Sequence, residues 1–224
     1  MSAQAHPLGD NSCKPLLKNI PLFAGLSESH FDQLARMAVC RKVLRNKTIV
    51  HVGDSTDSIF VIVSGSAKVL NRDVEGNEVI LTFLATGECF GEMGLIDGSP
   101  RSADVVASEN CELLEISKSD FTKALAGNVD LCLNIMKSLV LRLREANRKI
   151  ESLALMDVYG RVAKLLLDLS EVENGLRVIR RKITKQDMAK MIGASREMVS
   201  RVMKDLETSG YIRVEQGRIV LAED

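Results

Sequence analysis

A run of apolar residues at alternating steps of four and three constrains this chain more than any other feature. It comprises Cys132, Met136, Leu139, Leu143, Ala146, Ile150 and Leu153. This spacing keeps the apolar side chains on one narrow stripe of an α-helix, as in a helix that pairs with its own copy. No glycine or proline interrupts the run, and charged residues fill much of the remaining surface. The sequence therefore predicts a dimerisation helix and hinge at 128–157, roughly 40 Å long at about 1.5 Å per residue. The alternative is a long core helix packed only within its own chain.

The chain before this helix changes to a period of two. Strand-like segments lie at 59–63, 67–70, 79–84, 103–106 and 112–116. Gly65, Gly76 and Gly87 separate some of them at even intervals. Short strands with regular turn signals indicate an antiparallel sandwich or roll. The chain after the helix is mainly helical, so the fold class is α+β, with domains at 1–127, 128–157 and 158–224.

Local signals refine this outline. Residues 1–18 are small and polar and predict a loose arm. A short helix is expected at 29–37, and Ser117 or Ser119 is expected to cap another that ends at Gly127. Further expected elements are a helix carrying Val162, Leu165, Leu166 and Leu169, a polar loop at 171–175, an extended segment at 177–182, and a hairpin formed by 211–214 and 218–221.

Charge and cysteine usage limit the function classes. The net charge is zero, yet residues 177–204 hold nine basic and two acidic side chains. A local basic patch is the relevant electrostatic signal for DNA. The five cysteines are scattered without metal-binding spacing, which predicts neither a disulfide framework nor a metal site. No signal peptide or apolar run near about 18 residues is present, so we expect a cytoplasmic protein with no membrane partner.

The most specific motif lies at residues 183–206. Ala189 is small where two helices must approach closely, and Gly193 marks a turn between them. Val199, Val202 and Leu206 form the apolar side of the second helix. This order is typical of a helix-turn-helix, whose second helix enters the DNA major groove. The alternative is an ordinary helical hairpin with solvated charges.

The segment Gly-Ala-Ser-Arg-Glu-Met-Val-Ser-Arg at 193–201 resembles the recognition segment of the CRP/FNR family, and closely its cyclic AMP receptor protein branch. The resemblance extends from Ile20 to Leu221. It implies an N-terminal cyclic-nucleotide-binding antiparallel β-roll of jelly-roll type, the dimerisation helix, and a C-terminal winged helix-turn-helix.

The same resemblance implies how double-stranded DNA is read. Arg196 and Arg201 would each contact a guanine, and Glu197 would accept a hydrogen bond from a cytosine amino group. Thr184, Ser195 and Lys204 would contact phosphates, which set register rather than sequence. The implied site is a TGTGA-like palindrome bound by a two-fold dimer, with half-sites about 34 Å apart. Met198 departs from the family pattern, which often has threonine there.

Residues 90–103 carry a second motif. The spacing of their glycines does not fit a dinucleotide-binding loop. The stretch instead resembles the phosphate-binding cassette of cyclic-nucleotide domains, with Met93 inside it. By that resemblance Arg101 pairs with the cyclic phosphate and Ser102 donates to it. Glu92 accepts from the ribose 2′-hydroxyl, and Gly91 lets the backbone approach the sugar. A decayed cassette is the alternative, although both the glutamate and the arginine are present.

The cassette resemblance also implicates the long helix in contacts with the base. Alignment through Leu153-Ala154 places the family's adenine-contacting Thr-Ser pair at Ala146 and Asn147. Arg142, one turn earlier, matches another pocket residue. Ala146 has no hydroxyl, and losing one hydrogen bond costs about 0.5–1.5 kcal/mol. Cyclic AMP is therefore the first candidate effector, and cGMP and cyclic di-GMP stay open.

Other function classes have less support in the sequence. An iron–sulfur sensor would need clustered N-terminal cysteines, and no histidine has the context of a haem ligand. No nucleophile–base pair or metal cluster supports an enzyme. A ligand-independent DNA-binding protein stays open. The sequence thus predicts a homodimeric, ligand-responsive transcription regulator. RNA polymerase is an expected partner, through the loop at 170–176 by family analogy.

Overall fold

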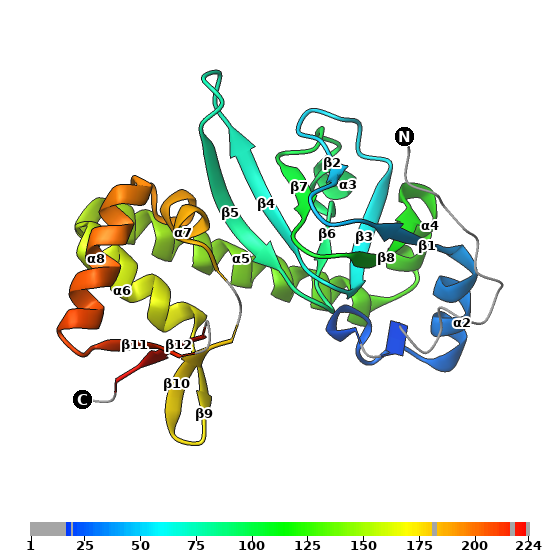
Figure 1. Cartoon of the computed structure of the whole chain (residues 1–224). Helices are drawn as coiled ribbons and strands as arrows, with labels where there is room; N and C mark the ends of the chain where they lie inside the picture. Colours follow the sequence, from blue (N-terminus) through cyan, green and yellow to red (C-terminus); the bar gives the residue numbers. More distant parts are fainter. Residues whose placement is uncertain (1–16, 19, 181–182, 216–217, 223–224) are drawn as a thin grey trace. The chain divides into compact units, whose positions relative to one another are not determined.

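The computed structural model describes residues 17–18, 20–180, 183–215 and 218–222. The chain divides into two compact units, Met1–Arg142 and Leu143–Asp224. Helix α5 (Val129–Leu155) begins in the first unit and ends in the second (Figure 1). The predicted domain limits at 127 and 157 stay predictions.

The first unit contains two four-stranded antiparallel sheets. One has the order β1-β8-β3-β6, with β1 (Ala38–Val43), β8 (Cys111–Ser117), β3 (Ser58–Ser64) and β6 (Cys89–Phe90). The other has the order β2-β7-β4-β5, with β2 (Thr48–Val50), β7 (Asp104–Ala107), β4 (Ala67–Arg72) and β5 (Glu78–Leu84). One hydrophobic cluster draws side chains from both sheets, including Phe60, Leu84 and Leu113. The predicted roll is confirmed, and β1, β2 and β6 are additional to the strands expected from the sequence.

Short helices complete the first unit: η1 (Pro21–Phe23), α2 (Glu28–Met37), α3 (Met93–Asp97) and α4 (Lys118–Ala126). Ser117 caps α4 by accepting a hydrogen bond from the Asp120 amide, which decides between the two predicted caps. The prediction of a loose arm over residues 1–18 is wrong at its end, because the Leu17 side chain is fully buried in the cluster with Phe23 and Phe121. Residues 1–16 lie outside the described part of the chain.

Helix α5 is buried only near its start. Asn128 accepts a hydrogen bond from the Leu131 amide, and Leu131 and Ile135 are in the core. The predicted stripe is open farther along: Leu143 is 62% exposed and Ile150 64% exposed. A helix packed only within its own chain would bury such side chains, so the core-helix alternative does not fit.

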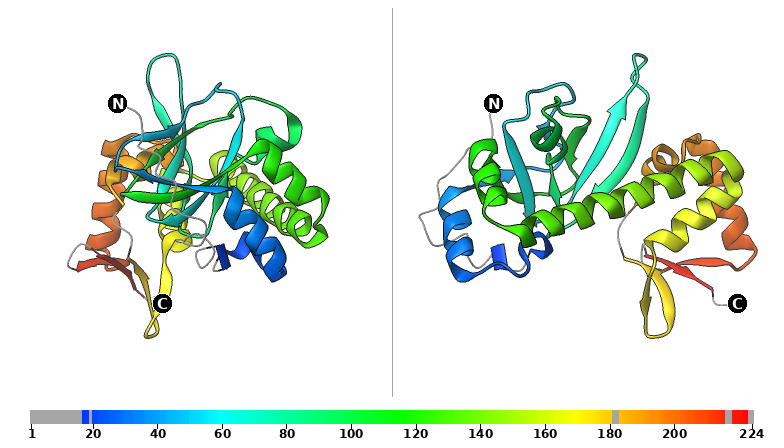
Figure 2. Two further views of the ribbon diagram at one scale, coloured as in Figure 1. Left: turned by 90° about the vertical axis from the view of Figure 1, so that its right-hand side faces the viewer. Right: turned by 180° about the vertical axis from the view of Figure 1, so that it is seen from behind.

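The second unit packs three helices, α6 (Val158–Leu169), α7 (Lys185–Ile192) and α8 (Arg196–Thr208), beside a small sheet (Figure 2). The sheet has the order β11-β12-β10-β9, with β11 (Ile212–Glu215), β12 (Arg218–Leu221), β10 (Leu176–Ile179) and β9 (Glu171–Glu173). The prediction of a polar loop at 171–175 is wrong. Its first three residues form β9, and Asn174 and Gly175 take positive φ angles at the turn into β10. Residues 181–182 of the expected extended segment, and the hairpin tip at 216–217, lie outside the described residues.

Among the residues described above, no helix taken alone has the length and hydropathy of a membrane span, and only α4 and α5 together, bent by 113°, reach them by length and composition. Histidine, cysteine, aspartate and glutamate side chains form no group there that could hold a metal ion.

Candidate functional site

Arg101 is the centre of the predicted cassette, and its side chain is buried. Nη1 donates to the Gly91 carbonyl at 3.1 Å, and Nη2 donates to the Ser58 carbonyl at 2.7 Å. The guanidinium also lies over the Phe60 ring, 5.7 Å from its centroid. Burial lowers the pKa of Arg101 from its ordinary value, and the nearby Asp57 carboxylate opposes that change. These contacts fix the guanidinium in place. Two or more of its five N–H groups take no part in the hydrogen bonds named above, and these can donate to an anion.

Glu92 lies beside it and is 2% exposed. Its Oε1 atom accepts a hydrogen bond from Arg142 Nη1 at 2.6 Å, and Arg142 Nη2 donates to the Cys89 carbonyl. The second carboxylate oxygen, Oε2, is buried and has no hydrogen-bond partner. A buried acceptor without a donor is costly. The site therefore holds an oxygen suited to accept from a ligand hydroxyl.

Backbone geometry explains the glycines of the cassette. Gly91 has φ +86°, and a Cβ there would lie 2.1 Å from Arg101 Nη1. A Cβ on Gly94 would lie 2.3 Å from the Ser99 carbonyl oxygen. The cassette is also held by backbone bonds to the loop before β3, from the Arg101 amide to the Asp54 carbonyl and from the Gly53 amide to the Arg101 carbonyl. Only glycine lets the chain pass this close to the arginine.

The structure brings only part of the predicted ligand set together. Arg101 donates to the Gly91 carbonyl, and the adjacent Glu92 accepts from Arg142, so these four residues lie close together. Ser102 and Met93 are exposed next to it in sequence. Ala146 and Asn147 are exposed on α5 and belong to the second unit.

Cys89 shows how strongly this region is shielded from water. Burial raises the pKa of its thiol to about 12, with a further rise from the Glu92 carboxylate and an opposing effect from Arg142. A thiol with such a pKa is protonated and unreactive at neutral pH.

The helix-turn-helix is present as predicted. Thr184 caps α7 by accepting from the Asp187 amide at 3.0 Å, and its hydroxyl donates to the Asp187 carboxylate at 2.8 Å. Gly193 has φ +62° at the turn. Ser195 then caps α8 by accepting from the Met198 amide at 3.2 Å. The two hydroxyls predicted to contact phosphate thus also start the two helices.

The solvent face of α8 carries the predicted DNA-reading side chains. Val199, Val202 and Leu206 are buried against the unit's core. Arg196, Glu197, Arg201 and Lys204 are all exposed. An exposed, polar, mostly basic helix face above an apolar one is suited to enter the major groove.

Sequence reasoning missed several contributors. The carbonyls of Ser58 and Cys89 hold the two arginines, and backbone groups of distant strands carry no sequence signal. Phe60 supplies the ring beneath Arg101. In the second unit, Arg161 Nη1 donates to the Ile192 carbonyl at 2.7 Å, at the end of α7. A cation there stabilises the helix C-terminus, and the proximity of Arg161 to this motif is visible only in the fold.

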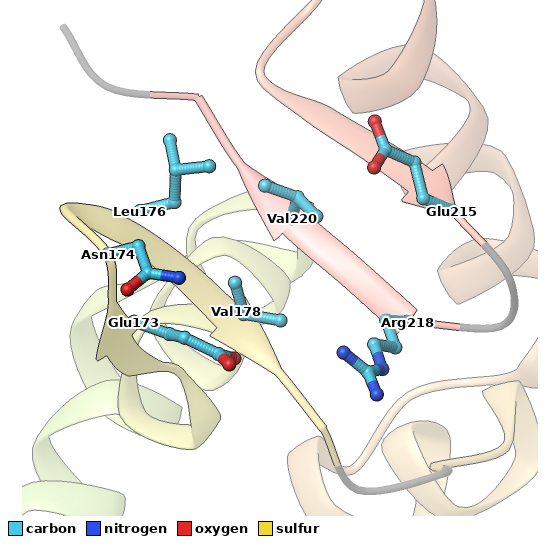
Figure 3. Close-up of a pocket in the computed structure, with 7 residues that line it drawn as sticks. All are labelled: Glu173, Asn174, Leu176, Val178, Glu215, Arg218 and Val220. Carbon is cyan, nitrogen blue, oxygen red and sulfur yellow. The ribbon is translucent and has the colours of Figure 1, made fainter.

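The C-terminal sheet also carries a pocket. It is lined by Glu173, Asn174, Leu176, Val178, Glu215, Arg218 and Val220 (Figure 3). None of the residues predicted to bind nucleotide or DNA lines it. Glu173, Asn174 and Leu176 do belong to the loop at 170–176 that was expected to contact a polymerase.

Comparison with protein families matches both units. Residues 40–128 match the cyclic nucleotide-binding domain, and residues 160–223 match the Crp-like helix-turn-helix domain. The chain is similar to the cAMP-activated global transcriptional regulator Vfr of Pseudomonas aeruginosa, at 36% identity over 86% of this chain and 93% of Vfr. It is also 36% identical to the cAMP-activated regulator CRP of Pasteurella multocida, over 78% and 85% of the two chains.

Solved structures give the same result. CLP of Xanthomonas campestris, a c-di-GMP-responsive global regulator, has a TM-score of 0.75 at 26% identity, over 88% of this chain and 100% of CLP. The catabolite activator protein of Thermus thermophilus has a TM-score of 0.54 at 32% identity, over 91% and 94%. With these likenesses and the two domain matches, the chain belongs to the CRP/FNR family of transcription regulators, which are not enzymes.

Proposed function

We propose that this protein is a homodimeric, sequence-specific DNA-binding regulator of the cytoplasm, controlled by a cyclic nucleotide, with cAMP as the first candidate. The observation that carries the nucleotide part is the buried pair Glu92 and Arg101, with Glu92 Oε2 left without a donor. A buried carboxylate oxygen without a donor costs free energy, and in a cassette that no longer bound a ligand nothing would offset that cost.

The two side chains match the two ends of a ribose cyclic phosphate. The remaining N–H groups of Arg101 suit the phosphate oxygens through charge-assisted hydrogen bonds. Glu92 Oε2 suits the 2′-hydroxyl, while Oε1 keeps its bond to Arg142. Through that bond the ligand would act on α5, because Arg142 is part of this helix. Ser102 and Gly91 complete the proposed phosphate and sugar contacts.

The base-contacting residues are proposed from the family resemblance. Ala146 lies one helical turn after Arg142 on α5, and Asn147 follows it. The asparagine side chain offers both a donor and an acceptor to a base edge, whereas alanine offers neither. Control by cGMP or by cyclic di-GMP is therefore a second candidate, and the similar structure of CLP is that of a c-di-GMP-responsive regulator.

The homodimer is proposed from the open stripe of α5. Met136, Leu143 and Ile150 are more than half exposed at positions of one heptad series. A second copy would cover them in a paired helix. We expect Leu143→Glu to give a monomer in analytical ultracentrifugation. Leu141→Glu is the matched control, because Leu141 is 60% exposed but lies off the stripe. A dimer that survives Leu143→Glu contradicts this interface.

The DNA target is proposed to be a TGTGA-like palindrome, with Arg196, Glu197 and Arg201 reading bases and Thr184, Ser195 and Lys204 contacting phosphates. RNA polymerase is proposed as the partner of the turn at 170–176. Val172 and Leu176 are exposed there, and exposed apolar side chains of this kind suit a protein contact.

The experiment is fluorescence anisotropy with a labelled duplex carrying the palindrome, at one fixed salt concentration. Binding is measured without ligand and with cAMP, cGMP or cyclic di-GMP. Stronger binding with cAMP alone supports the first candidate. A response to another nucleotide supports the second. Equally tight binding under all conditions contradicts nucleotide control and indicates a ligand-independent DNA-binding protein.

A further inference from the structure

We propose that Met198 reads a thymine in the major groove, through contact between its thioether side chain and the thymine 5-methyl group. This inference rests on the proposed function, because it requires α8 to enter the groove of the palindrome. It assigns base recognition to a residue other than the predicted Arg196, Glu197 and Arg201.

The position of Met198 places it on the reading half of the helix. It lies in the first turn of α8, directly after Arg196 and Glu197. It precedes Arg201 by three residues, and side chains three apart on a helix are neighbours. Its side chain is 45% exposed. Met198 is therefore an apolar side chain within an otherwise polar, exposed face.

Packing within the chain covers only part of this side chain. Helices α7 and α8 contain four methionines. Met188 and Met203 are buried in the core of the second unit, and Met191 is packed against it. Met198 belongs to neither set. Of the four, it is the one with an exposed side chain, and this exposed part can contact a partner.

The chemistry of Met198 narrows what that partner can be. Its amide already donates to Ser195 Oγ at 3.2 Å, so the amide is not available to a phosphate. Its side chain has no N–H or O–H donor, and its sulfur is a weak acceptor. Among the groups on the base edges of the major groove, the thymine methyl is the apolar one. A flexible, polarisable methionine adapts well to such a contact.

The test separates the methyl group from every other property of the base pair. Each thymine of the palindrome is replaced in turn by deoxyuridine, in both half-sites, and binding is followed by anisotropy with the effector present. The replacement removes the methyl group and keeps the pairing. For the wild-type protein we expect one thymine position at which the loss is about four-fold per half-site, the effect of one buried methyl-sized group.

Two variants assign that loss to Met198. Met198→Gln keeps the side-chain length but removes its apolar end, and we expect it to bind thymine and deoxyuridine equally at that position. Met198→Leu keeps an apolar end and should retain the discrimination. Leu167→Gln is the control, because Leu167 is 50% exposed on α6 of the same unit and should behave as the wild type.

The inference is overturned if the wild type shows no sensitive thymine, or if Met198→Gln remains as sensitive as the wild type. Failure of the proposed function gives a different result. In that case the wild-type protein binds the all-thymine palindrome no more tightly than an unrelated duplex, whichever of the three cyclic nucleotides is present.

Discussion

The two functional regions of this protein are built in opposite ways. The proposed nucleotide site consists of buried charges: Glu92 and Arg101 are 2% and 7% exposed, and carbonyls from two strands hold the arginines. The proposed DNA surface consists of exposed side chains on α8, and its local order comes from caps at Thr184 and Ser195. The first region depends on the completed β-roll, and the second on one short segment.

This difference predicts that substitutions in the two regions affect folding stability and binding affinity differently. Removing a buried charged group leaves its former partners unsatisfied, so ligand affinity and folding should fall together. Removing an exposed side chain changes few contacts within the fold, so DNA recognition should fall while stability is nearly unchanged. Substitutions in each region can therefore test this contrast.

Arg101→Ala should lower cyclic nucleotide affinity by at least about 100-fold, because the phosphate loses charge-assisted hydrogen bonds. It should also lower the free energy of unfolding by about 1–3 kcal/mol, since the Ser58 and Gly91 carbonyls lose their donor. Calorimetric titration and urea denaturation measure the two effects. Arg72→Ala, on β4 outside the predicted ligand set, is the control for nucleotide binding. Unchanged nucleotide affinity in Arg101→Ala contradicts the assigned role.

Arg196→Ala should cost about 1–3 kcal/mol of binding at its own guanine. Anisotropy with the consensus duplex and with duplexes mutated at single base pairs should show the loss of discrimination at one position. The free energy of unfolding should stay within about 0.5 kcal/mol of the wild type, because Arg196 is exposed. If every base is still discriminated, Arg196 does not read the site. A large loss of stability would remove the contrast between the two regions.

Lys204→Ala should weaken binding to all duplexes by a similar factor. Lys204 is exposed on α8, and a phosphate contact carries no base information. The slope of log affinity against log salt should decrease in magnitude by about one. Lys68→Ala, on β4 of the first unit, serves as the control and should leave the slope unchanged. A Lys204→Ala variant with the wild-type slope would show that this lysine lies away from the phosphates.

Cys89→Ala should have the smallest effect, a change in how the free energy of unfolding depends on pH. It tests how deeply the proposed nucleotide site is buried. The pKa of Cys89, about 12 in the folded chain, exceeds the ordinary value of 9.0. The folded protein therefore keeps the proton where the unfolded chain loses it. The contribution of the Cys89 thiol to the free energy of unfolding is therefore fully present below about pH 9, and it decreases as the pH rises toward 12. Between pH 8 and 10, the wild type should lose roughly 1 kcal/mol more unfolding free energy than Cys89→Ala. Equal losses in both proteins would indicate an ordinary thiol.

The same contrast explains what the sequence could predict. The helix-turn-helix was predictable because its signals are local: caps at Thr184 and Ser195, Gly193 at the turn, and apolar residues at helical spacing. The cassette was recognisable from its ordered motif, and Arg142 from its match to a pocket residue of the resembling family branch.

The remaining features depend on long-range packing. The Ser58 and Cys89 carbonyls carry no side-chain signal, so their bonds to Arg101 and Arg142 appear only in the folded roll. The sequence predicts a loop in place of strand β9 because Glu171 and Glu173 are polar, and pairing with β10 outweighs their weak strand propensity. The overall small and polar composition of residues 1–18 predicts a loose arm that includes Leu17, yet the core around Phe23 buries this side chain.

We expect the proposed nucleotide site and DNA surface to be coupled, and measurements of reciprocal binding test this coupling. Nucleotide affinity is measured by calorimetry for the free protein and for its complex with the palindrome, and DNA affinity is measured with and without nucleotide. We predict that nucleotide strengthens DNA binding by roughly 5- to 150-fold and that DNA strengthens nucleotide binding by the same factor. Tight nucleotide binding that leaves DNA affinity unchanged would contradict the account.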